Sequence, residues 1–489
     1  MTKLFTRREF LKCAAIVTAE TAFAVGASKT PKTNSRLPNF VFILVDDLGW
    51  SDVGCYGSDL HETPNIDRLA QQGMRFTDAY AAASVCSPTR ASIMTGKCPA
   101  RLHMTIWYEG SDRPVLNRKL IPPFTEGNLP HEQVTIAEVL KGAGYFTAHL
   151  GKWHLGEATH YPETQGFDVN IGGTLWGAPT TYFYPYFGSG LWKKEFRYVP
   201  HLEFGSEGEY LTDRLTDEAI KVIKKVKDKP FYINLCYHTV HTPIEGKSEL
   251  VEHYKNKVKP GMHHQNYEYA AMVHCLDENV GKLMSQLEEL GVADNTVVFL
   301  FSDNGGYVNQ YKKRIVTNNY PLRSGKGSLY EGGIREPLLI RWPGVTEAGS
   351  VCREPVSSID FYPTILDISG LKGDPNHNAD MDGISLMSLL KNPNAKLDRN
   401  TLYWHYPHYY ATTSPVSALR QGDWKLLEYF EDNHVELYNL KNDIKEQDDL
   451  ADKMPAKAEE LRENLHQWRK SMNAQMPKVN PQYKRKVKK

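Results

Sequence analysis

Four short apolar segments, each followed at once by polar side chains, constrain the fold of this chain more than any other feature. The segments are residues 39–45, 144–150, 231–237 and 297–301. A continuous apolar run of this length is typical of a strand buried on both faces, as in a parallel sheet. Helical patterns separate these runs, at residues 66–72, 135–141, 211–226 and 267–290. The alternation predicts an α/β fold with a large, mostly parallel central sheet flanked by helices.

Each predicted strand ends in side chains that can bind ions or transfer protons. They are Asp46 and Asp47, Lys152 and His154, His238 and His241, and Asp303 and Asn304, in chain order. In an open α/β sheet, ligands bind beyond the carboxyl ends of the strands. We therefore expect these eight side chains to converge on one active site.

The first and last of these strand ends offer a set of oxygen ligands. Asp46, Asp47, Asp303 and Asn304 include no thiolate and no imidazole, so the set suits a hard divalent cation, Ca²⁺ or Mg²⁺. For Asp46 and Asp47 alone, capping of a helix after a strand is an alternative. Their combination with Asp303 and Asn304 favours a cation site.

Cys86 precedes a helical pattern at residues 91–96. Pro88 suits the first turn of a helix and Ser87 suits its N-cap, which predicts that Cys86 lies at a helix N-terminus. Backbone N–H groups there favour an anion, although a lone cysteine before a helix is more often structural. The chain has 7 cysteines and no CxxC pair, so neither a disulfide framework nor a zinc knuckle is indicated.

The pattern Cys86-x-Pro88-x-Arg90, followed by Thr95-Gly96, resembles the signature of the type I sulfatases of the alkaline phosphatase superfamily. In that family this cysteine is oxidised to formylglycine (3-oxoalanine). Residues 45–49, 151–156, 303–306 and 323–333 resemble the family's other motifs in the same order. The resemblance runs from residue 38 to the C-terminal helical pattern. It implies an alkaline-phosphatase-like sandwich and a sulfuric ester hydrolase.

The resemblance also implies a mechanism. Formylglycine at position 86 would be hydrated, and one hydroxyl, held near the cation and Arg90, would attack sulfur while Asp303 accepts its proton. The second hydroxyl would then expel sulfate and regenerate the aldehyde. Ca²⁺ is the cation that the family favours at Asp46, Asp47, Asp303 and Asn304.

Four more residues match functional positions of the family. Lys152 and Lys326 match sulfate-contacting lysines, and His154 matches a candidate base for the elimination step. His241, in the His-Thr-Pro context, matches the histidine that protonates the leaving alkoxide. His238, three residues earlier, is the alternative for that role.

The substrate expected from the resemblance is a sulfated carbohydrate of the galactose or N-acetylgalactosamine type. Candidate substrate-binding side chains are His103, His238, His405, His408 and Arg420, with ordinary surface or interdomain roles as the alternative. Two other functions remain open. One is a phosphomonoester or phosphonate hydrolase of the same superfamily, and the other is an inactive glycan-binding homologue.

The chain divides into five predicted parts. They are a twin-arginine-like signal peptide (1–27), a linker (28–37), the catalytic α/β domain (38–374), a smaller C-terminal α+β domain (375–478) and a basic tail (479–489). Export of this kind carries folded proteins and predicts a periplasmic or secreted enzyme. The implied partners are the saccharide and the enzyme that modifies Cys86, either a formylglycine-generating or an anaerobic maturation enzyme.

Charge and hydropathy argue against nucleic acid as a partner and against a membrane span. Lys plus Arg and Asp plus Glu both number 58, so no global positive field is expected to hold nucleic acid. The segment at residues 13–27 is interrupted by Glu20, and no later apolar run is long enough for a membrane span.

Overall fold

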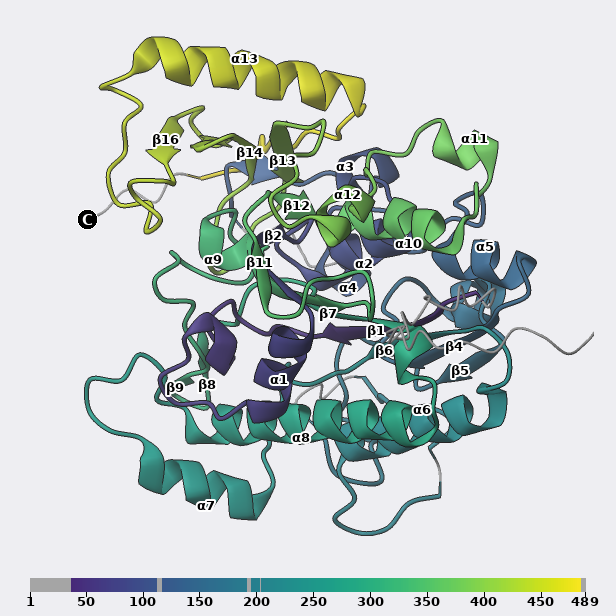
Figure 1. Cartoon of the computed structure of the whole chain (residues 1–489). Coiled ribbons are helices and arrows are strands. Elements are labelled where there is room, and N and C mark those ends of the chain that lie inside the picture. The colour runs from purple at the N-terminus through teal and green to yellow at the C-terminus, as the bar shows by residue number, and fades with distance from the viewer. Residues whose placement is uncertain (1–36, 112–116, 191–194, 203, 485–489) are drawn as a thin grey trace, which may run out of the picture. The chain divides into compact units, whose positions relative to one another are not determined.

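The computed structural model describes residues 37–111, 117–190, 195–202 and 204–484, and in them a nine-stranded mixed sheet forms the centre of the fold (Figure 1). The strand order is β11 (Ser350–Cys352), β2 (Met74–Tyr80), β10 (Arg335–Arg341), β7 (Thr296–Ser302), β1 (Asn39–Val45), β6 (Phe231–Cys236), β4 (Phe146–Gly151) and β5 (Val169–Ile171), and β12 (Val356–Ser357) also pairs with β2. The four apolar runs of the sequence are the adjacent parallel strands β7, β1, β6 and β4. Only β10 runs antiparallel to its neighbours β7 and β2 in this sheet of the described chain. The predicted fold class is confirmed.

Alternate residues of β1 belong to two separate hydrophobic cores. Ile43 and its odd-numbered neighbours pack on one face, whereas Phe42 and its even-numbered neighbours pack on the other, as the two-residue period of a strand requires. The helices of the first core are α1 (Pro64–Gln72), α6 (Leu211–Val226) and α8 (Tyr267–Glu289), with α7 (Ser248–Lys257) packed on α8. Those of the second are α2 (Cys86–Thr95), α5 (Ile136–Gly142), α10 (Phe361–Ser369) and α12 (Met387–Lys391). Figure 1 shows these two layers below and above the strands.

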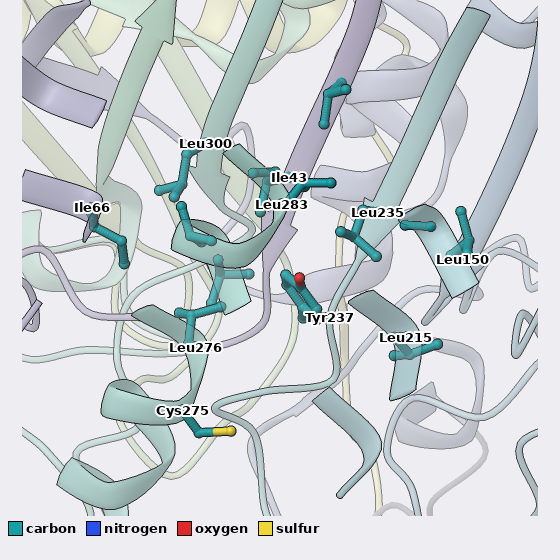
Figure 2. Packing of buried hydrophobic residues seen from close by; sticks show 14 of the residues in the cluster. Ile43, Ile66, Leu150, Leu215, Leu235, Tyr237, Cys275, Leu276, Leu283 and Leu300 are labelled. Carbon is teal, nitrogen blue, oxygen red and sulfur yellow. The ribbon is translucent and has the colours of Figure 1, made fainter. Parts of the chain in front are cut away.

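Leucine side chains dominate the first core. Figure 2 shows Ile43, Leu150, Leu235 and Leu300 from the strands beside Leu215, Leu276 and Leu283 from the helices. Each of these side chains is fully buried, and burial of one such side chain contributes about 1.5–3 kcal/mol. This packing holds the strand ends in fixed relative positions.

A second, smaller sheet follows near the C-terminus. Its antiparallel strands are β13 (Thr401–Tyr406), β14 (Val416–Gln421), β15 (Trp424–Tyr429) and β16 (Val435–Asn439), and α13 (Pro455–Ser471) covers one face. Trp404 on the other face packs against Tyr80 and donates a hydrogen bond to the main-chain oxygen of Ala81. Leu389 still belongs to the core of the large sheet. The antiparallel sheet begins at Thr401, and the domain boundary at residue 375 stays a prediction.

Short elements complete the described chain. They are the helices α3 (Pro99–Leu102), α4 (Tyr108–Ser111), α9 (Glu331–Ile334) and α11 (Pro375–Asn378), the 3-10 turns η1 (Gly54–Tyr56), η2 (Ala158–His160), η3 (Pro162–Thr164), η4 (Ala293–Asn295) and η5 (Ser358–Asp360), the hairpin of β8 (Gln310–Tyr311) and β9 (Arg314–Ile315), and the pair of β3 (Leu120–Ile121) with β17 (Lys478–Val479). The start of the predicted basic tail thus pairs with residues 120–121, and the amide of Lys484 donates to Asn117.

Two regions of the sequence stay untested by this structure. The predicted signal peptide and nearly all of the linker precede residue 37, outside the described residues. Within the described residues, none of the helices combines the length and the apolar character that a membrane crossing requires.

Candidate active site

The carboxyl ends of β1, β4, β6 and β7 meet at one edge of the large sheet. Val45 pairs in register with Ser302, and both Leu44 and Gly151 pair with Cys236. The residues that follow these strands therefore start from the same level of the sheet. The strand ends meet at one edge, as the sequence predicts, and the active-site role of the residues that follow them stays a prediction.

Three buried carboxylates face three buried cationic side chains at this edge. The pairs are Asp46 Oδ2 with Lys152 Nζ (2.7 Å), Asp47 Oδ1 with Lys326 Nζ (2.6 Å) and Asp303 Oδ2 with Arg90 Nε (2.9 Å). Although burial opposes ionisation of Asp47, the charges of Lys326 and His241 lower the pKa of its carboxyl to about 2. The formal charges of the six side chains cancel.

The oxygen atoms of this edge fit a divalent cation. Asp46 Oδ1 and Asn304 Oδ1 are both buried and have no hydrogen-bond partner, which is costly for polar atoms away from water. Burial, together with the charges of Asp303 and Asp47, raises the pKa of Asp46 well above its usual range. A hard cation would satisfy both oxygens and favour the ionised form of Asp46.

Cys86 is the first residue of α2, and Val85 is the N-cap with an extended backbone. The prediction that Cys86 lies at a helix N-terminus is confirmed. The capping role predicted for Ser87 is wrong, because the helix starts one residue before it. The Ser87 hydroxyl donates instead to the main-chain oxygen of His154, at 2.8 Å. This bond connects α2 to the segment that follows β4.

His154 connects Cys86 to a carboxylate. Its Nδ1 lies 3.3 Å from Cys86 Sγ, and its Nε2 lies 3.2 Å from Glu109 Oε2. Burial opposes the thiolate, but the charges of Lys152, His154 and Lys326 lower the pKa of the Cys86 thiol to about 6.

The pKa shifts of His154 and Glu109 agree with this arrangement. Although burial disfavours the imidazolium, the charges of Cys86 and Glu109 raise the pKa of His154. Burial also opposes ionisation of Glu109, but His154 lowers the pKa of its carboxyl to about 2. The residue at position 86 thus sits among groups that stabilise a negative charge on it.

The sequence does not predict Glu109 as a site residue, because it lies on the short helix α4 and belongs to none of the motifs. Gly177 approaches His154 from another side. A Cβ atom on Gly177 would lie 2.2 Å from His154 Cε1, so only glycine fits there without moving the ring.

Cys86, Glu109 and His154 open into a cavity of about 1120 Å³. The residues that line its inner end include Asp47, Cys86, His154, His241 and Lys326, and those of its outer wall include Trp107, Glu109, Arg118, Arg197, Tyr307, His408, Tyr409 and Tyr410. The cavity is larger than most small-ligand sites, which span about 300–1,000 Å³. Its wall combines aromatic faces with charged groups of both signs.

Of the five side chains predicted for the substrate rim, His408 lines this cavity and the other four do not. Its Nε2 lies 2.7 Å from the hydroxyl of Thr105. His238 is buried and does not line the cavity, whereas His241 lines it and turns Nε2 toward Asp47 Oδ2, at 3.6 Å.

The remaining three rim candidates make their polar contacts elsewhere. His103 Nε2 contacts the main-chain oxygen of Asn473, and His405 lies between Ser417 and the main chain of Gln475. Arg420 donates to Asp78 and to the Tyr80 hydroxyl, joining β14 to β2. The contacts of Arg420 thus join the two sheets, whereas those of His405 stay within the C-terminal domain.

Two family profiles match the chain. The profile described as "Sulfatase" matches residues 38–371, and the profile described as "N-sulphoglucosamine sulphohydrolase, C-terminal" matches residues 325–475. Together they cover the large sheet and the antiparallel sheet.

Known proteins resemble the chain over most of its length. A "Sulfatase" of Formosa agariphila is 33% identical over 92% of this chain and 92% of that protein. The human N-acetylgalactosamine-6-sulfatase is 32% identical over 81% of this chain and 76% of its own length. The solved structure of Ps i-CgsB in complex with k-i-k-neocarrahexaose superposes with a TM-score of 0.74 and 32% identity, covering 89% of this chain and 93% of that one.

Proposed function

The chain belongs to the sulfatase family and is a sulfuric ester hydrolase, and from this premise we propose that it removes sulfate from a sulfated carbohydrate by means of a formylglycine made from Cys86. The observation that carries the proposal is the position of Cys86 Sγ. It lies at the N-terminus of α2, 3.3 Å from His154 and near the charges of Lys152 and Lys326, which contact Asp46 and Asp47. Formylglycine at this position supplies a hydrated aldehyde, with one hydroxyl to attack sulfur and a second to expel sulfate.

Different residues around position 86 take part in the different proton transfers. His154 Nδ1 faces the side chain at position 86 directly and is our candidate base for the elimination step. Asp303 is our candidate for the proton of the attacking hydroxyl, and Arg90 holds its carboxylate at 2.9 Å. Glu109 orients the His154 ring and increases its basicity.

Two lysines are placed to bind the sulfuryl oxygens. Lys152 and Lys326 already carry charge in the buried site, each in contact with an aspartate. Donors held in place before the reaction stabilise charge that develops in the transition state. We propose that a bound sulfate ester shares these two lysines with Asp46 and Asp47.

We propose that Asp46, Asp47, Asp303 and Asn304 hold Ca²⁺. A divalent cation there supplies positive charge for the sulfuryl oxygens. Because the six charged side chains already cancel, the cation would leave the site with two positive charges. That charge favours an anionic ester and matches the two negative charges of the sulfate product.

His241 is our candidate for protonation of the leaving alkoxide. Its Nδ1 lies 2.8 Å from the main-chain oxygen of Thr242, which leaves Nε2 facing the cavity. Burial and the charge of Lys326 lower the pKa of His241 well below its usual range. A bound anionic ester beside Lys326 would offset that charge and favour a proton on His241. A general acid contributes about 10²–10⁴ in rate.

For the substrate we propose a galactose or N-acetylgalactosamine type of sugar. The relative named for N-acetylgalactosamine-6-sulfate and the structure with bound neocarrahexaose both support a carbohydrate. Trp107, Tyr409 and Tyr410 offer aromatic faces along the cavity, and such faces suit the apolar sides of sugar rings.

The test is a screen of defined sulfated saccharides with Ca²⁺ present, combined with mass spectrometry of the Cys86 peptide. We expect turnover only when position 86 is modified, and none with Cys86→Ala. The ratio of kcat/KM for an aryl sulfate to that for an aryl phosphate decides between the sulfatase and its phosphoesterase relatives. A preference for phosphate would overturn the proposal, as would glycan binding without turnover by an unmodified thiol in the native host.

We also propose that the protein is exported to the periplasm or secreted, as Arg7 and Arg8 predict. Fusion of residues 1–36 to a reporter that folds in the cytoplasm tests this. Export that persists after both arginines are replaced by lysine would contradict a twin-arginine route.

A further inference from the structure

A second cluster of metal-ligating side chains lies outside the catalytic cavity. Asp52, His61 and His264 each offer one ligand atom, and these atoms all lie within 4.8 Å of one another. The exposed fractions of the three residues are 0%, 5% and 3%, so the cluster is closed to bulk water. None of the three lines the catalytic cavity, and the catalytic assignments above do not use them.

The surroundings of His264 resemble the second shell of a metal site. His264 Nδ1 lies 2.8 Å from Asp59 Oδ1. His61 Nδ1 lies 2.8 Å from the main-chain oxygen of Asp52 and 3.7 Å from its Oδ1. Histidines that bind metals usually donate their other ring N–H to a carboxylate or a main-chain carbonyl, which fixes the ring. Asp59 therefore orients His264 so that its Nε2 points into the cluster.

His264 Nε2 has no hydrogen-bond partner despite its burial. It lies 3.2 Å from Asp52 Oδ1, out of line for a hydrogen bond. With the proton on Nδ1, the Nε2 lone pair and the carboxylate oxygen lie close together with no proton between them, which is repulsive unless both face a common positive charge. Two ligands of a tetrahedral cation with bonds of about 2.0–2.1 Å lie about 3.4 Å apart, close to the observed separation.

We propose that Asp52, His61 and His264 bind a transition-metal dication of the Zn²⁺ class, at a site distinct from the hard-cation site of the strand ends. Two imidazoles and one carboxylate suit Zn²⁺ and its neighbours, whereas the all-oxygen catalytic set suits Ca²⁺. The two sites would thus select different metals in the same protein.

The site joins segments that are far apart in the sequence. Asp52 follows β1 by seven residues, His61 precedes α1, and His264 precedes α8. Asp52 Oδ2 also accepts hydrogen bonds from the Gly49 amide (2.7 Å) and the Tyr269 hydroxyl (2.6 Å), and this hydroxyl lies 3.3 Å from the main-chain oxygen of Asp47. A metal bound here would stabilise the loop that carries Asp47.

The competing explanation is a protonated His264 that bridges Asp52 and Asp59 without any metal. A direct titration with Co²⁺ distinguishes the two explanations. It uses the full-length protein, saturated with Ca²⁺ and stripped of transition metals. We expect this protein to bind one equivalent of Co²⁺ with the intense visible absorption of a tetrahedral site, and Zn²⁺ to displace it. His264→Gln and His61→Gln should each weaken Co²⁺ binding at least tenfold.

His263→Gln is the matched control, because His263 is adjacent in sequence but stacks on Tyr320 instead of joining the cluster. It should bind Co²⁺ as the unaltered protein does. Asp59→Asn keeps all three ligands and should weaken binding about 10–100-fold by removing the carboxylate that orients His264. If the His264 and His61 variants do not fold, X-ray absorption at the zinc edge of the unaltered protein gives the answer, with two nitrogen ligands expected. Absence of a tetrahedral Co²⁺ band, or equal binding by folded His264→Gln, would establish the protonated bridge and overturn the proposal.

Discussion

Cys86 Sγ and His154 Nδ1 lie 3.3 Å apart, and the opposite nitrogen of the same ring contacts Glu109 at 3.2 Å. This relationship makes the protonation of His154 depend on both neighbours. After conversion of Cys86 the thiolate is gone, and Glu109 becomes the main group that raises the pKa of His154.

The first prediction concerns Glu109→Gln, which keeps the shape of the side chain and removes its charge. The pKa of His154 should fall, because Glu109 is one of the charges that raise it. A general base is inactive at pH values where it is protonated, so the acid limb of the kcat profile, which includes the elimination step, should move to lower pH. The weaker base should also reduce the plateau of kcat by about tenfold or more. A pH profile with unchanged limb and plateau would contradict the role given to Glu109.

The second prediction concerns the unmodified protein, produced without maturation enzymes. A thiol pKa of about 6 at Cys86 means that the thiolate predominates at pH 7. Alkylation by iodoacetamide, followed by peptide mass spectrometry, should therefore rise with a midpoint near pH 6. Cys236 is the internal control, since burial raises the pKa of its thiol to about 12. Replacing His154 by alanine should move the Cys86 midpoint to higher pH.

The third prediction concerns removal of the hard cation. Chelation of Ca²⁺ should abolish turnover and lower the melting temperature, and saturation at about 100 times Kd should restore about 2.7 kcal/mol of stability. Burial raises the pKa of Asp46, so protons compete with the cation for its carboxylate. Ca²⁺ affinity should therefore fall as the pH is lowered, measured by titration calorimetry. Asp303→Ala should lose activity and Ca²⁺ affinity together, whereas full turnover by this variant would refute its assigned role.

Much of the large sheet can be predicted from the sequence because β1, β4, β6 and β7 are continuous apolar runs with both faces buried. The sequence does not predict β10 in the same way, because the apolar residues of this strand lie between Arg335 and Arg341. Both arginines are nevertheless buried. Ion pairs of Arg335 with Asp78 and Glu331 make this burial acceptable. Asp78 lies far from Arg335 in the sequence, so a local window does not reveal this partner.

The residues of the candidate site also differ in how far the sequence predicts them. Asp46, Lys152 and Asp303 follow apolar strands directly, so the sheet itself dictates their meeting point. Glu109 comes from the short helix α4 and Arg118 from an irregular segment, neither of which follows a strand of the large sheet, yet both line the cavity. His405 is the opposite case. It is a polar residue of β13 whose hydrogen bonds stay inside its own domain, and it does not line the cavity.

The fourth prediction follows from the correction of Arg420. This side chain is buried and bonded to Asp78 and Tyr80, so its truncation leaves Asp78 with one fewer cationic partner. Arg420→Ala should reduce the free energy of unfolding by about 1.5–3 kcal/mol, measured in urea, because Arg335 still pairs with Asp78. KM for the saccharide should stay within about twofold at a temperature where the variant is folded. A large rise in KM with little loss of stability would instead restore Arg420 to the substrate rim.

The fifth prediction tests how tightly the position of His154 is controlled by the wall behind it. Gly177→Ala would place a methyl group 2.2 Å from His154 Cε1, so either the ring or the loop at residue 177 must move. Displacement of a catalytic group by about 1 Å can reduce the rate about 10²-fold, and we expect kcat to fall by at least tenfold. The control is Gly142→Ala, where no atom lies within 4 Å of the added methyl group and α5 should gain up to about 1 kcal/mol. Because Gly177 lines the cavity wall, its variant should remain folded by circular dichroism while losing turnover. Unchanged kcat in folded Gly177→Ala would mean that the His154 ring is free to shift, and that its contacts with Cys86 and Glu109 do not set the rate.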